Sequence, residues 1–166
     1  MNENICLSCG FCCDGTVIGV VRLNREEVSI SKELMDIEEV NGEGFFLQPC
    51  DKLSCNGCTI YPQRPKQCAS FNCGLLGALN QKKIDFDSAI EVIDLVKRKK
   101  AVITEKLETL HFELKSPSFH FKMIELKKIM LKNQSEISST QDLSELISEI
   151  KKLDMLMSKE FGLSLF

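Results

Sequence analysis

Apolar residues recur at spacings of three and four over the second half of the chain, the pattern of helices with one buried face. A first stripe predicts a long helix that starts at Asp87 or Ser88, with Glu91 reaching back to Ser88. Its members are Ala89, Ile93, Val96, Lys100, Ile103, Leu107, Leu110 and Leu114, with Lys100 as the polar exception.

Two further stripes complete this helical half. Ser116-Pro117 is typical of a helix start, and it precedes apolar positions at Phe119, Met123, Leu126 and Met130. A polar stretch, 133–140, predicts a linker. The last helix is predicted from about Gln141 to Phe161, with Gly162 as its stop. Its apolar side contains Leu143, Leu146, Ile147, Ile150, Leu153 and Met157.

The first half has shorter and more varied patterns. The β-branched run 15–23 predicts a strand, and Asn24 with Glu27 forms a capping box for a helix from about Arg25 to Met35. Residues 36–44 are acidic and predict a loop, whereas 45–47 predict a second strand. A short helix is predicted from Gly74 to Asn80.

Cysteine is distributed unevenly along the chain. All nine cysteines lie in the first 73 residues, with four of them within residues 6–13. We expect residues 1–14 to lack regular structure, and three prolines interrupt the second group between residues 48 and 73. The sequence predicts an α+β fold, with a small irregular cysteine-rich domain at 1–80 and a helical extension at 81–166 that packs on it.

Charge and composition narrow the class of protein. A net charge of −3 argues against general nucleic-acid binding, and no apolar run approaches the length of a membrane span. The first residues do not resemble a secretory signal, so we expect a cytoplasmic protein. In a reducing compartment, clustered cysteines bind metal more often than they form disulfides.

The cysteine spacing predicts thiolate metal sites. Cys6 with Cys9, and Cys55 with Cys58, have the C-x-x-C spacing that brings two sulfur atoms to one metal. Cys12 and Cys13 are adjacent, so two different metals use them more easily than one. The economical interpretation is two sites of four thiolates, about two zinc ions, that draw on both groups. Arg64 and Lys66 are in a position to offset the negative charge.

Iron is the alternative metal. C-x-x-C-x-x-C is also the first part of the cysteine motif of bacterial ferredoxins. In that motif the fourth cysteine follows after three residues and precedes a proline. Here Cys13 follows at once and Asp14 comes next. A [4Fe–4S] cluster whose fourth ligand is a distant cysteine is therefore an alternative to zinc.

The chain resembles the YkgJ-like cysteine-cluster family, a zinc- or iron-chelating domain. The resemblance rests on Cys6-x-x-Cys9-Gly10-x-Cys12-Cys13, on Gln48-Pro49-Cys50 and on the run 58–73, and it covers roughly residues 5–95. It implies that the metal ligands are Cys6, Cys9, Cys12, Cys13, Cys50, Cys58, Cys68 and Cys73. Cys55 is then the extra cysteine, and Ala69 stands where the family usually has Arg.

Three hypotheses for the function remain open. The first is a structural or accessory module that holds zinc or iron, whose C-terminal helices offer a surface to a protein partner. The second is an iron–sulfur redox or protein-modifying enzyme, because some relatives are linked to protein methylation. The third is a metal or thiol buffer. The sequence assigns no catalytic residue, substrate or oligomeric state, and His111, His120 and Asp14 are each expected to be structural.

Overall fold

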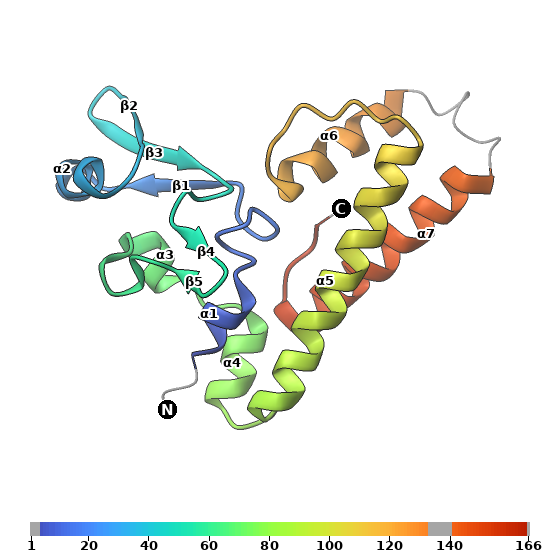
Figure 1. Ribbon diagram of the computed structural model, residues 1–166, viewed down its shortest axis with the longest axis horizontal. Helices are drawn as coiled ribbons and strands as arrows, with labels where there is room; N and C mark the ends of the chain where they lie inside the picture. Colours follow the sequence, from blue (N-terminus) through green and yellow to red (C-terminus); the bar gives the residue numbers. More distant parts are fainter. Residues whose placement is uncertain (1–3, 133–140, 166) are drawn as a thin grey trace. The chain divides into compact units, whose positions relative to one another are not determined.

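The computed structural model describes residues 4–132 and 141–165. These residues divide into two compact units. The first unit contains the chain up to Asn72 together with Pro117–Phe121, and the second contains Cys73–Ser116 and the chain from Lys122 onward. The fold is α+β, as predicted, with short strands in the cysteine-rich part and helices in the C-terminal half (Figure 1).

A three-stranded antiparallel sheet forms the hydrophobic part of the first unit. Its strand order is β1 (Val20–Leu23), β3 (Glu43–Leu47) and β2 (Glu38–Val40). Successive side chains of a strand point to opposite faces, so one face of the sheet is apolar and is packed against α2 (Arg25–Leu34) (Figure 1). The small core consists of Ile18, Val21, Leu23, Val28, Met35 and Phe46.

The remaining elements of this unit are very short. They are α1 (Ile5–Cys9), the hairpin of β4 (Leu53–Ser54) and β5 (Gly57–Cys58), the 3₁₀ turn η1 (Tyr61–Gln63) and α3 (Lys66–Ser70). The expectation that residues 1–14 lack regular structure was wrong for α1. Asn4 accepts a hydrogen bond from the N–H of Cys6 at 3.0 Å, and Gly10 ends the turn with a left-handed φ of 72°.

Local signals predicted the start of α2 well. Both hydrogen bonds of the capping box between Asn24 and Glu27 are present. The loop predicted at 36–44 was partly wrong, because Glu38–Val40 pairs with β3. Acidic residues rarely indicate a strand, and here the pairing partner decides the conformation.

The second unit is built on two long antiparallel helices, α5 (Phe86–Thr109) and α7 (Gln141–Leu156) (Figure 1). Their apolar stripes face each other, and ion pairs flank the contact, with Lys106 Nζ 2.9 Å from Glu145 Oε2. α4 (Gly74–Asn80) packs against α5 and against the π-helical turn η3 (Met157–Phe161), which ends at Gly162 as predicted.

Three helix boundaries differ from the prediction. α5 ends at Thr109, whereas the predicted stripe continued to Leu114. Asp85, and not Asp87 or Ser88, caps α5, because its Oδ1 accepts from the N–H of Ser88 at 2.7 Å. The helix α6 (Phe119–Lys132) begins two residues after Pro117, where Ser118 Oγ accepts from the N–H of Phe121 at 3.3 Å. The linker predicted at 133–140 lies outside the described residues, and the division into 1–80 and 81–166 stays a prediction.

The core of the helical unit gives a first testable prediction. Leu146 on α7 is 0% exposed, whereas Leu131 on α6 is 60% exposed. Leu146→Ala should lower the free energy of unfolding by about 2–5 kcal/mol, because it removes buried methyl groups and leaves a cavity. Urea denaturation followed by far-UV circular dichroism measures the change. Leu131→Ala is the matched control and should stay within about 0.5 kcal/mol of the wild type.

Candidate metal centre

The first cysteine group is held by two consecutive tight turns. Cys6 and Cys9 lie three residues apart on the single turn of α1, so they are neighbours on its surface. After Gly10 the chain turns again, with the N–H of Cys13 donating to the carbonyl of Gly10 at 2.9 Å. Asp14 is a turn residue, as expected, because its Oδ1 accepts from the N–H of Thr16 at 2.8 Å.

The second group begins on the β4–β5 hairpin. Ser54 Oγ donates to the carbonyl of Gly57 at 2.9 Å and accepts from the N–H of Asn56 at 3.2 Å, which fixes the turn. Cys55 lies at the tip and is exposed, whereas Cys58 on β5 is partly buried. The hairpin therefore presents one cysteine to solvent and one to the interior.

A close backbone approach joins α1 to this hairpin. Gly57 has a φ of +91°, and a Cβ added to it would lie 2.7 Å from the carbonyl oxygen of Leu7. Only glycine fits such a position without displacing a neighbour. The two C-x-x-C sequences, which are far apart along the chain, are thus held against each other by α1 and β5.

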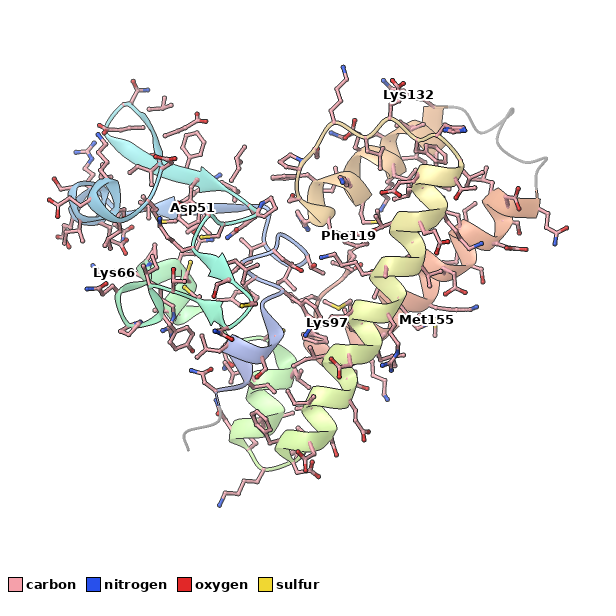
Figure 2. All side chains as sticks on the ribbon, viewed as in Figure 1. Asp51, Lys66, Lys97, Phe119, Lys132 and Met155 are labelled. Atoms are coloured by element: carbon pink, nitrogen blue, oxygen red, sulfur yellow. The ribbon has the colours of Figure 1, made fainter. Side chains whose placement is uncertain are left out.

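A backbone hydrogen bond joins the two groups a second time. The N–H of Cys50 donates to the carbonyl of Cys13 at 2.7 Å. Cys58 on β5 and Cys68 on α3 lie close to these two residues, and Figure 2 shows sulfur atoms (yellow) among β4, β5 and α3. We call Cys13, Cys50, Cys58 and Cys68 the thiol quartet.

Negative charge on neighbouring thiols contributes to the raised pKa values within the quartet. Burial raises the pKa of Cys13 to about 12, and negative charge on Cys58, Cys50, Cys68 and Asp14 adds to the effect. Burial, followed by Cys50 and Cys58, raises the pKa of Cys68 to about 11. Burial also raises the pKa of Cys50, which the N–H of Lys52 opposes. The pKa values of Cys13, Cys50 and Cys68 are therefore each raised in part by negative charge on other thiols of the quartet.

The described residues do not show a finished coordination sphere. Within residues 4–132 and 141–165, no three His, Cys, Asp or Glu side chains are grouped as ligands of one ion. The nine cysteines are all described, and they are thiols and not disulfides. The donor set fits zinc or iron chemically, because clustered thiols are the soft ligands that select these metals.

The comparison with family models identifies the chain. The model described as "CxxCxxCC: Putative zinc- or iron-chelating domain" matches residues 5–90, just over half of the 166 residues. The chain belongs to this CxxCxxCC family. Comparison with curated proteins and with solved structures gave no significant match. No helix in the described part of the chain is long and apolar enough to cross a membrane.

The other cysteines of the CxxCxxCC domain lie in several settings. Cys12 packs against the small core of the first unit, as Cys50 and Cys68 of the quartet also do. Cys73 belongs to the second unit and caps α4, where its Sγ accepts from the N–H of Leu76 at 3.5 Å. The eight-cysteine ligand set therefore stays a prediction, and the quartet is the subset linked by charge effects on the pKa values of Cys13, Cys50 and Cys68.

Of the two predicted counter-cations, Arg64 lies near the quartet. Its positive charge opposes the raised pKa of Cys68. The guanidinium stacks 3.7 Å above the ring of Tyr61, and its Nη1 donates to the Tyr61 carbonyl at 2.6 Å. Lys66 instead pairs with Glu26, with Nζ 3.4 Å from Oε2 at an exposed position.

Sequence reasoning missed several supporting residues. Asn4 caps α1 and also accepts from the hydroxyl of Tyr61 at 3.3 Å, so it links the first cysteine group to η1. An Asn two residues before a C-x-x-C is a capping signal that could have been recognised. The role of Gly57 had no local signal, because it depends on Leu7, fifty residues earlier.

A groove of about 760 Å³ lies elsewhere in this unit. Residues of β1, the start of α2, β3 and the β2–β3 turn line it, and its lining contains no cysteine. It is therefore separate from the thiol quartet.

The contact between Gly57 and Leu7 leads to a second prediction. Gly57→Ala should destabilise the first unit, because the added Cβ meets the Leu7 backbone and the φ of +91° disfavours a side chain. Gly42→Ala is the control, since Gly42 has a φ of +79° but no neighbour within 4 Å. Amide hydrogen exchange in residues 5–9 should accelerate in Gly57→Ala and stay unchanged in Gly42→Ala. Equal effects in the two variants would show that the contact contributes nothing.

Proposed function

We propose that this CxxCxxCC-family chain is a structural metal-binding module whose thiol quartet holds one zinc or iron ion. The observation that carries the proposal is the quartet itself: four partly buried thiols from four separate segments, each within electrostatic reach of the others. A bound cation would offset the repulsion between their thiolates, and thiolates are the soft ligands that zinc and iron select.

The weakness of the surrounding hydrophobic core supports a structural role. The core cluster of the first unit has six buried residues. Cys58 and Cys68 lie on elements of two and five residues, and Cys13 and Cys50 lie outside helices and strands. Elements of this length do not fold by themselves. A metal that binds the folded state alone adds its binding free energy to folding, about 2.7 kcal/mol when free metal exceeds Kd a hundredfold.

Zinc is the favoured occupant of a structural site. A site of four thiolates is closed, with no open position for a substrate or water, and this is characteristic of structural zinc. Cys6, Cys9 and Cys12 offer thiols for the second ion that the sequence predicts. Cys55 is not part of either set in this proposal, because it is exposed at the hairpin tip.

The first test is metal content measured together with acid-labile sulfide on protein purified without oxygen. Cys68→Ser should lose about one metal ion per chain, because it removes a quartet ligand. Cys55→Ser is the matched control and should retain the wild-type content. Equal metal content in Cys68→Ser and the wild type would remove the quartet from consideration, and iron with matching sulfide would favour the iron–sulfur alternative.

The raised thiol pKa values predict how metal affinity depends on pH. The pKa values of Cys13 and Cys68, about 12 and about 11, mean that both thiols hold a proton at neutral pH. Binding as thiolates releases these protons, so affinity should rise with pH between about 6 and 9. Titration with Zn²⁺ in weakly buffered solution and a pH indicator should show at least two protons released per ion. Release of no proton would contradict thiolate ligation.

A further inference from the structure

A five-residue segment, Pro117–Phe121, belongs to the first unit although the residues on both sides of it belong to the second. Ser118 is 0% exposed and Phe119 is 5% exposed. Phe119, labelled in Figure 2, lies at the first turn of α6. We call residues 117–121 the latch segment, because a segment so isolated in sequence must be held by its contacts.

Two glycines provide the surface on which the latch segment is held. A Cβ on Gly15 would lie 2.5 Å from the Cβ of Ser118, and one on Gly19 would lie 2.7 Å from the ring of Phe121. The N–H of His120 donates to the carbonyl of Gly15 at 2.8 Å. Gly15 and Gly19 thus form a notch that admits the segment only because neither has a side chain.

The notch is built on the same backbone that carries two thiols of the quartet. Gly15 follows Cys13 by two residues, and the side chain of Gln48, two residues before Cys50, lies beside Gly15. The N–H of Gln48 donates to the carbonyl of Gly19 at 3.0 Å, and the N–H of Cys50 donates to the carbonyl of Cys13 at 2.7 Å. Any force that fixes Cys13 relative to Cys50 therefore also fixes the notch.

Two buried polar atoms, one on the latch segment and one beside the notch, have no hydrogen-bond partner among the described residues. They are His120 Nδ1 and Gln48 Oε1, respectively. Gln48 is 2% exposed. Buried polar atoms without partners oppose the apolar contacts of Ser118, Phe119 and Phe121. These two atoms lower the net stability of the docked arrangement.

We propose that docking of the latch segment is coupled to metal binding, an inference that rests on the proposed function of the quartet. A cation held by Cys13 and Cys50 fixes the notch and keeps residues 117–121 docked. Loss of the cation loosens the notch and releases the segment, which frees the first turn of α6. The latch segment thereby reports the metal state of the cysteine unit to the helix that follows it. Because coupling is reciprocal, weakening the latch must also weaken metal binding.

The experiment measures both directions of this coupling. Gly19→Ala fills the notch, and Phe121→Ala removes the facing ring without changing the notch backbone; neither residue is a metal ligand. Gly77→Ala is the control, because Gly77 has no neighbour within 4 Å. Zn²⁺ affinity is measured by competition with a chromophoric chelator, and amide exchange of residues 117–121 is measured by mass spectrometry with zinc and after chelation.

We expect Gly19→Ala to bind Zn²⁺ about fivefold more weakly or worse, and to exchange residues 117–121 faster even when zinc is bound. Phe121→Ala should change both readouts in the same direction, and it keeps the test valid if Gly19→Ala does not fold. Wild-type affinity and unchanged exchange in a folded variant would overturn the latch. If Cys68→Ser binds Zn²⁺ as tightly as the wild type, the quartet is not the metal site and the proposed function is wrong. That result would not contradict the contacts of the latch segment with the notch.

Discussion

Burial and mutual repulsion oppose negative charge on the thiol quartet, and the organisation of the cysteine-rich unit depends on this constraint. Cys13 and Cys68 retain their protons at neutral pH because each lies in a partly desolvated position beside other thiols. Only Arg64 contributes an opposing positive charge to Cys68 within the described contacts. A cluster of this kind is suited to a cation, since a bound cation replaces the protons and removes the repulsion between the sulfur atoms.

The backbone around the quartet is held by turns and caps more than by a hydrophobic core. Asn4, Asp14 and Ser54 each accept a backbone N–H within a tight turn. Two longer-range contacts then connect the turns: the hydrogen bond from Cys50 to Cys13, and the approach of Leu7 to Gly57. These contacts fix the backbone around the sulfur atoms, which within the described residues are not grouped as ligands of one ion.

The helical unit is stabilised in a different way. Its stability comes from two long amphipathic helices, α5 and α7, whose apolar stripes are buried over several turns. The latch segment is the exception, because residues 117–121 pack with the cysteine-rich unit while the rest of α6 belongs to the helical one. In the coupling proposed above, this anchored first turn is the point at which metal binding would affect the C-terminal half.

Local sequence signals determined the helices, the capping box of Asn24 and Glu27, the stop at Gly162 and the family of the chain. Each of these depends on residues within a few positions of one another or on a fixed cysteine spacing. Tertiary structure alone decided that Glu38–Val40 is a strand and that Cys13 lies near Cys50, Cys58 and Cys68. It also decided that residues 117–121 lie with the first unit. The physical reason is the same in each case: these features depend on contacts between segments far apart in sequence, for which spacing along the chain carries no signal.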